Sequence, residues 1–148
     1  MKVIQQILPW DKQFHHIQFQ FQSFKMIIQC FILSSNNLMK DKLIRFVSHT
    51  YFLEVFDKNE LSFDDGYPIL MFLDMDSFKL GAAYIKKMLL LPLIPVFISS
   101  MYSKSFISNW LQIDTLNMGY LNKTADYTGF IEEISRVIDH CNIDPVRK

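Results

Sequence analysis

The chain has too few cysteines for a disulfide scaffold or a cysteine-rich metal site. Among its 148 residues there are only two, Cys30 and Cys141, which lie far apart in apolar surroundings. This spacing favours reduced thiols in a hydrophobic core. The adjacent histidines His15 and His16 have no further cysteine or histidine nearby, so we assign no metal site to them. Reduced cysteines are typical of the cytoplasm, which is the location we expect.

The chain also lacks an excess of charge of either sign. Fifteen Lys and Arg residues balance fifteen Asp and Glu residues, which leaves a formal net charge of +0. A balanced chain has no overall field that would attract it to nucleic acid or to an anionic membrane surface. We therefore expect no direct nucleic-acid partner and no membrane partner, and recognition of any other partner by local complementarity.

No hydrophobic run is long and regular enough to indicate a membrane span. The longest apolar run, residues 88–98, contains Pro92 and Pro95, so it predicts a helix end, a turn and a strand. Near the N-terminus, apolar residues 3–8 are interrupted by two glutamines and followed by Pro9. That segment is too short and too polar to predict a signal peptide.

What the chain has in quantity is hydrophobic residues, which make up 50% of it and are enough for the core of one domain. The first 25 residues differ from the rest, because Ile17, Phe19 and Phe21 alternate with glutamines at a strand period. They form either an edge strand or an extension upstream of a domain that starts near Met26. We favour the extension, which divides the chain into residues 1–25 and a domain at residues 26–148.

From residue 26 onward, apolar runs of strand length alternate with stretches of helical period. Strands are expected at residues 27–33, 52–56, 69–73, 96–99 and 118–122, and helices at residues 38–48, 80–91 and 104–116 and near the C-terminus. Only residues 59–65 are available for a helix between the second and third strands, so this second helix must be shortened. Five β-α units predict a doubly wound, flavodoxin-like α/β fold with a five-stranded parallel sheet.

The apolar periods of two helices predict the faces that they bury. The C-terminal helix has apolar residues at i, i+4, i+7, i+8 and i+11, which share one stripe. These residues are Phe130, Ile134, Val137, Ile138 and Cys141. In the first helix, the residues expected to point inward are Leu38, Leu43, Phe46 and Val47.

Polar residues follow several of the predicted strands. In an open parallel sheet, the reactive site lies beyond the carboxyl ends of the strands. We therefore expect an aspartate, a hydroxyl and a lysine to converge at that edge. The residues concerned are Ser34, Ser35 and Asn36 after the first strand, Asp74 after the third, Ser99 and Ser100 after the fourth, and Lys123 after the fifth.

In order and spacing, these motifs resemble the receiver domain of bacterial response regulators, the CheY-like family, from about residue 26 to residue 140. PILMFLDMD resembles the strand that ends in the phospho-accepting aspartate, here Asp74. IPVFISS resembles the fourth strand, whose terminal hydroxyl, here Ser99, binds the phosphoryl group. GYLNK resembles the fifth strand, with the phosphoryl-binding lysine at Lys123 and the switch aromatic at Tyr120. The resemblance implies a cytoplasmic signalling domain of a two-component phosphorelay, which is not an enzyme.

The largest departure from the family lies in CFILSSNN, where two adjacent acidic residues usually follow the first strand. Ser34 and Ser35 occupy those positions. Magnesium is held by carboxylates and water, and phosphoryl transfer to a carboxylate depends on that ion. We therefore expect no resident cofactor, with magnesium bound weakly or not at all, and a degenerate, atypical receiver.

Two loops beside this site also depart from the family pattern. After Asp74 the usual Met-Pro is replaced by Ser77 and Phe78, and Gly81 comes one residue early, so the loop is shorter. After Lys123 the family commonly has a cis-proline, whereas this chain has Thr124. A cis bond there would cost about 3 to 4 kcal/mol, so we expect a trans bond and a shifted loop.

Structural interpretations of the same residues stay open. Asp74 could be the charged partner of Lys123, since opposite charges a few ångströms apart favour their ionised forms. Ser99 could satisfy backbone groups at the strand end, and Tyr120 could be a core aromatic with its hydroxyl at the surface.

A different function is suggested by FLDMDSF, which also resembles the first motif of haloacid-dehalogenase phosphatases. There the first aspartate is the nucleophile and the second the general acid, roles that would go to Asp74 and Asp76. That family begins with its nucleophile strand and needs an acidic motif after the lysine. Here two strands come first, and the later acidic residues Asp126, Glu132 and Glu133 lie in or near a helix.

We therefore expect a receiver-like domain that works by protein–protein interaction with impaired magnesium-dependent phosphorylation. The alternatives are the phosphatase and a conventional phosphorylated receiver. The expected partner is a sensor histidine kinase or another signalling protein. A homodimer would form through the face of the fourth helix, fifth strand and fifth helix.

Overall fold

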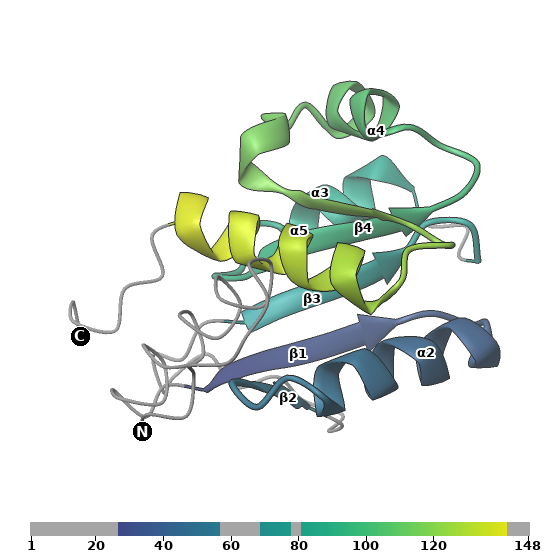
Figure 1. Cartoon of the computed structure of the whole chain (residues 1–148). Coiled ribbons are helices and arrows are strands. Elements are labelled where there is room, and N and C mark those ends of the chain that lie inside the picture. Colours follow the sequence, from purple (N-terminus) through teal and green to yellow (C-terminus); the bar gives the residue numbers. More distant parts are fainter. Residues whose placement is uncertain (1–26, 57–68, 78–80, 142–148) are drawn as a thin grey trace.

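A parallel sheet forms the centre of the fold (Figure 1). The computed structural model describes residues 27–56, 69–77 and 81–141, and all structural statements below concern these. The strands are β1 (Ile28–Leu33), β2 (Leu53–Val55), β3 (Ile69–Asp74), β4 (Ile94–Ser99) and β5 (Gly119–Asn122). The helices are α2 (Asn37–Ser48), α3 (Ala82–Met88), α4 (Lys104–Leu111) and α5 (Tyr127–His140), with a 3-10 turn η1 (Thr115–Asn117).

The strand order is β2-β1-β3-β4-β5, with every pairing parallel. The chain runs from β1 to one edge at β2, then returns past β1 to build β3, β4 and β5 on the other side. This order confirms the predicted doubly wound α/β sheet. The predicted short helix at residues 59–65 and the extension at residues 1–25 lie outside the described residues.

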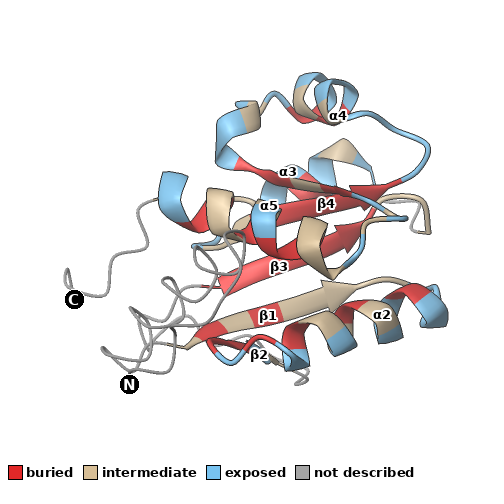
Figure 2. Ribbon diagram, viewed as in Figure 1, coloured by how far each residue is buried: buried red, intermediate tan, exposed pale blue. Residues whose placement is uncertain are grey.

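Helices cover both faces of the sheet, and each face has its own core. The first core packs α2 and α5 against side chains such as Cys30, Phe72 and Ile98. The second packs α3 and α4 against Met71, Phe97 and the other side chains that point the opposite way along the same strands. The central strand β3 is buried at every residue, as expected of a strand covered on both faces (Figure 2).

The expected inward face of α2 was wrong at one residue. Leu38 is 81% exposed, and the buried residues are Met39, Leu43 and Val47. These buried residues are spaced by four, so they share one face of the helix. Leu38 comes one residue before Met39 and is therefore rotated about 100° from that face. Phe46 packs partly buried against the core, as expected.

The helix expected at residues 104–116 ends early, at Leu111. Gln112 adopts a left-handed conformation with φ of 58°, which stops the helix, and the chain then forms η1. Likewise, α3 ends at Met88, three residues before the predicted end, in a turn that leads to Pro92. Proline lacks the N–H that a continuing helix requires.

The stripe predicted on α5 is buried at Phe130, Ile134, Val137 and Ile138, while Cys141 is partly buried. Cys30 is a buried free thiol in the first core, as expected, and Cys141 is also free. Gly119 lets Val96 of β4 and Val137 of α5 pack close to β5, because a Cβ there would lie 2.9 Å from a methyl of Val96 and 3.2 Å from a methyl of Val137. No described helix has the length and hydropathy of a membrane span.

Candidate functional site

The register of the sheet brings the predicted polar residues together at one edge. Leu33 pairs with Leu73, so Ser34 follows beside Asp74, and Ser99 pairs with Asn122, so Lys123 follows beside the end of β4. The main chain continues the β3–β4 pairing by one residue, since the N–H of Met75 donates to the carbonyl of Ile98 at 2.8 Å. The site therefore lies where β1, β3, β4 and β5 end.

Asp74 is enclosed at the centre of this edge, with no exposed side-chain surface. Its Oδ1 lies 3.1 Å from the ammonium of Lys123 and accepts the N–H of Asp76 at 3.2 Å. Its Oδ2 accepts the hydroxyl of Ser34 at 2.7 Å. Both carboxylate oxygens thus have partners, which is what a buried charge requires.

The two serines at the expected acidic-pair positions point to different places. Ser34 contacts Asp74 through its hydroxyl. Ser35 turns instead to the loop after β3, where its N–H donates to the hydroxyl of Ser77 at 3.1 Å and its own hydroxyl donates to the carbonyl of Ser77 at 2.9 Å. Only the first of the two positions therefore borders Asp74 directly.

Asp76 is the site residue that the receiver interpretation of the sequence missed. It lies in a turn closed by the N–H of Ser77, which donates to the carbonyl of Asp74 at 3.4 Å, so its side chain folds back over the strand ends. Burial raises the pKa of this carboxyl, but hydrogen bonds from Ser99 and Ser100 and the charge of Lys123 outweigh burial and lower the pKa to about 2. Asp76 is therefore ionised at neutral pH.

Lys123 lies between the two carboxylates. Its ammonium is 3.1 Å from Oδ1 of Asp74 and 3.4 Å from Oδ2 of Asp76. Burial lowers the pKa of Lys123, but the hydrogen bonds and charges of the two aspartates raise it by more, so the net shift is upward. Its backbone carbonyl accepts the ammonium of Lys42 at 2.8 Å, which ties the loop after β5 to α2.

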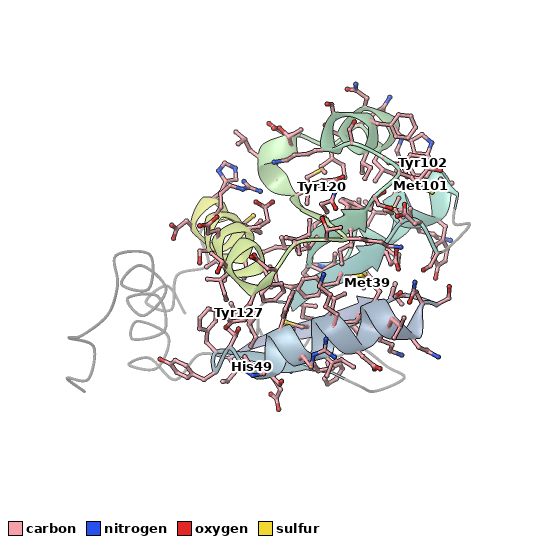
Figure 3. The ribbon with its side chains drawn as sticks, turned by 45° about the vertical axis from the view of Figure 1, so that its right-hand side comes forward. Met39, His49, Met101, Tyr102, Tyr120 and Tyr127 are labelled. Atoms are coloured by element: carbon pink, nitrogen blue, oxygen red, sulfur yellow. The ribbon has the colours of Figure 1, made fainter. Side chains whose placement is uncertain are left out.

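Tyr120 connects this site with the start of α4. Its hydroxyl donates to the carbonyl of Tyr102 at 2.7 Å and lies 3.4 Å from that of Ser99. Burial and then the charge of Asp76 raise the pKa of the Tyr120 phenol, so it keeps its proton as a donor. The two tyrosines lie together beside α4 (Figure 3). The hydroxyl is bonded within the fold and is not simply at the surface.

The residues that surround Asp74 do not suit a magnesium ion. Magnesium prefers carboxylate and water oxygens, but the two carboxylates at this edge share a lysine ammonium and accept N–H and O–H donors. Within the described residues, no group of three or more His, Cys, Asp or Glu side chains could hold a metal ion.

The arrangement also weighs against a haloacid-dehalogenase phosphatase. A general acid has to carry a proton, whereas Asp76 has a pKa of about 2. Two of the acidic residues after Lys123 are engaged elsewhere, since Asp126 caps α5 and Glu133 accepts the N–H of Tyr120 at 2.8 Å and pairs with Arg136. No described peptide bond is cis, so Lys123–Thr124 is trans, as expected.

The comparisons with known proteins give a structural likeness and nothing from sequence. No protein-family model matches the chain, and no curated protein matches it. A solved structure does match: the signal receiver domain assigned to the response regulator NarL of Mycobacterium tuberculosis. The likeness covers 74% of this chain and 94% of that one, with a TM-score of 0.52.

The fold is that of a receiver domain. At 16% sequence identity, the likeness to the mycobacterial domain shows the fold alone. This fold agrees with the receiver resemblance of the strand-end motifs. That resemblance predicts Asp74, Ser99, Tyr120 and Lys123 at one edge of the sheet. The roles of these residues in phosphoryl chemistry stay predictions.

Proposed function

We propose that this receiver-fold domain signals by binding another protein, and that magnesium-dependent phosphorylation of Asp74 is impaired. The partner would be a sensor histidine kinase or another signalling protein, or a second copy of the chain. The domain would have no catalytic turnover of its own.

The state of Asp74 carries this proposal. A phospho-acceptor must present a carboxylate oxygen to the incoming phosphorus, but both oxygens of Asp74 are bonded and the side chain has no exposed surface. The place of a metal-binding acid beside it is taken by Ser34, a neutral donor. Without a divalent ion, the charge that develops on a transferring phosphoryl group has only Lys123 to neutralise it.

The capacity to bind a protein is supported by the surface around α4. Tyr102, Phe106 and Trp110 form a row of stacked rings, with centroids 5.2 Å and 6.5 Å apart, and they are 37%, 48% and 38% exposed. Met101 and Leu116 beside them are 68% and 51% exposed. Aromatic and methionine side chains are enriched at protein interfaces, so this surface fits a protein partner.

The test is intact-mass measurement after incubation with magnesium and acetyl phosphate. We expect no phosphoryl adduct on the parent protein, and none on Asp74→Asn or on Asp139→Asn, a matched change at an exposed aspartate of α5. A stoichiometric adduct that persists in Asp139→Asn and disappears in Asp74→Asn would show a conventional phosphorylated receiver.

A further inference from the structure

Donors at the ends of β4 and β5 converge on the carboxylate of Asp76. Ser99 donates its hydroxyl to Oδ1 at 2.7 Å. Ser100 donates its N–H at 2.7 Å and its hydroxyl at 3.0 Å to Oδ2, and the ammonium of Lys123 lies 3.4 Å from the same oxygen. We call Ser99, Ser100 and Lys123 the oxyanion pocket, because hydroxyl, backbone N–H and ammonium donors of this kind bind small oxyanions.

The donors of the oxyanion pocket are oriented by the protein itself. Ser99 is fully buried, and its hydroxyl oxygen accepts the N–H groups of Met101 at 3.0 Å and Tyr102 at 2.8 Å. A hydroxyl has two acceptor sites and one proton, so these two bonds leave the proton to point at Asp76. The pocket is therefore prepared for an anion at the place where the Asp76 carboxylate lies.

Asp76 enters this pocket from a different part of the chain. It belongs to the turn after β3, whereas the donors belong to the end of β4, to the residue that follows β4 and to the residue that follows β5. Its side chain is only 7% exposed, so its carboxylate lies among these donors and is largely covered by the protein. Asp76 is therefore placed as a ligand that binds these donors, and it is not part of the chain segments that position them.

We propose that Asp76 is an intramolecular ligand of the oxyanion pocket. Its carboxylate stands where a bound oxyanion would, and holds the loop after β4 in one arrangement without phosphorylation. When the Asp76 side chain is removed, the pocket becomes a binding site for a small free oxyanion such as inorganic phosphate. The proposal rests on the proposed function in one respect, signalling that does not require phosphorylation of Asp74.

The occupied pocket is connected to the exposed surface around α4. Ser99 fixes the N–H of Tyr102, Tyr120 fixes the carbonyl of Tyr102, and the ring of Tyr102 stacks on Phe106, which stacks on Trp110. Loss of the Asp76 carboxylate releases the proton of Ser99 and loosens this chain of contacts. Trp110 therefore reports on the pocket from the far end of the row.

The experiment compares Asp76→Ala with the parent in a Trp10→Phe background, because Trp10 and Trp110 are the two tryptophans of the chain. Melting temperature and Trp110 fluorescence are measured in sodium phosphate and in sodium chloride of equal ionic strength. We expect Asp76→Ala to lower Tm by roughly 3 to 8 °C in chloride and to shift the Trp110 emission. Phosphate at tens of millimolar should then reverse part of both changes, because it binds only the folded state.

Three controls make the result specific. Asp139→Ala removes an exposed aspartate and should show no phosphate response. Ser99→Ala added to Asp76→Ala should abolish the response, because it removes a donor of the pocket. Asp76→Asn keeps the size of the side chain but removes its charge. This variant should lower Tm and shift the Trp110 emission, and it provides the measurement if Asp76→Ala does not fold.

Two outcomes would overturn the proposal. One is an equal phosphate response in Asp76→Ala, the parent and Asp139→Ala, which would be a general salt effect. The other is Trp110 emission that neither Asp76 variant changes. The proposed function fails on a different result, a phosphoryl adduct on Asp74 of the parent protein in the intact-mass measurement. That result does not depend on the response to free phosphate.

Discussion

The hydroxyl of Ser34 donates a 2.7 Å hydrogen bond to Oδ2 of Asp74, from a position 40 residues earlier in the chain. The contact gives Asp74 a neutral hydroxyl donor at the position where the receiver resemblance would predict an acid. It leaves three charged groups at the strand ends, two carboxylates and one ammonium. Whether this edge of the sheet can bind a divalent ion can be tested by adding carboxylates at positions 34 and 35.

The double change Ser34→Asp and Ser35→Asp should create magnesium binding. Without metal, a carboxylate at position 34 would lie against Asp74, and like charges in one cleft destabilise the folded state. Millimolar magnesium should raise the melting temperature of the double variant by binding only its folded form. The control is Ser105→Asp, which adds a carboxylate at an exposed position of α4. No magnesium-dependent gain would mean either that the loop after β3 closes the metal position or that Ser34 and Ser35 do not correspond to the acidic pair of the family.

The ionised state of Asp76 predicts a pH-dependent contribution to stability. The folded pKa of about 2 lies below the ordinary value of 3.8, so this contribution is present above about pH 4 and is lost as pH falls toward 2. The difference in unfolding free energy between the parent and Asp76→Asn should therefore shrink over that range. Urea denaturation at several pH values measures it, and a difference that stays constant with pH would contradict the pKa assignment.

Tyr120→Phe should destabilise the protein by about 0.5 to 1.5 kcal/mol, because it removes the hydrogen bond from the phenol to the carbonyl of Tyr102 and leaves that oxygen to find water. Tyr84→Phe is the matched control, since Tyr84 is 53% exposed on α3 and should tolerate the change. Equal stability of the two variants in urea denaturation would show that the Tyr120 hydroxyl contributes nothing to the fold.

Phe106→Glu should weaken any self-association through the surface around α4 without lowering the melting temperature appreciably, because Phe106 is 48% exposed. Sedimentation equilibrium over a wide concentration range measures the effect, with Tyr84→Glu on α3 as the control. A parent protein that stays monomeric throughout would remove the homodimer from the proposed function. A dimer unaffected by Phe106→Glu would place the contact on another face.

A chain that starts at Met26 should unfold as cooperatively as the full chain, because the five described strands pair into one sheet within residues 28–122. Circular dichroism during urea denaturation compares the two chains. A broader transition at lower urea in the shorter chain would show that Ile17, Phe19 and Phe21 contribute to the folded domain.

Local patterns predicted the secondary structure because burial has a period that a strand or helix imposes on its own sequence. β3 is apolar at every position up to Asp74 since both of its faces are covered, and the α5 stripe recurs at helical spacing since one face packs on the sheet. Helix ends were less predictable. The left-handed Gln112 that stops α4 carries no glycine or asparagine signal, and its turn is closed by the N–H groups of Gln112 and Ile113, which donate to the carbonyls of Asn109 and Ser108.

By itself, the sequence determined the α/β fold and the set of strands whose ends would meet, because parallel strands joined by crossovers all end at one edge. Only the tertiary structure decided which side chains meet there. The turn after β3 places the carboxylate of Asp76 against the donor groups of Ser99, Ser100 and Lys123. The same edge separates Ser34 from Ser35, adjacent in sequence yet bonded to different loops. Such pairings depend on the register between strands that are distant in the chain, which no local period encodes.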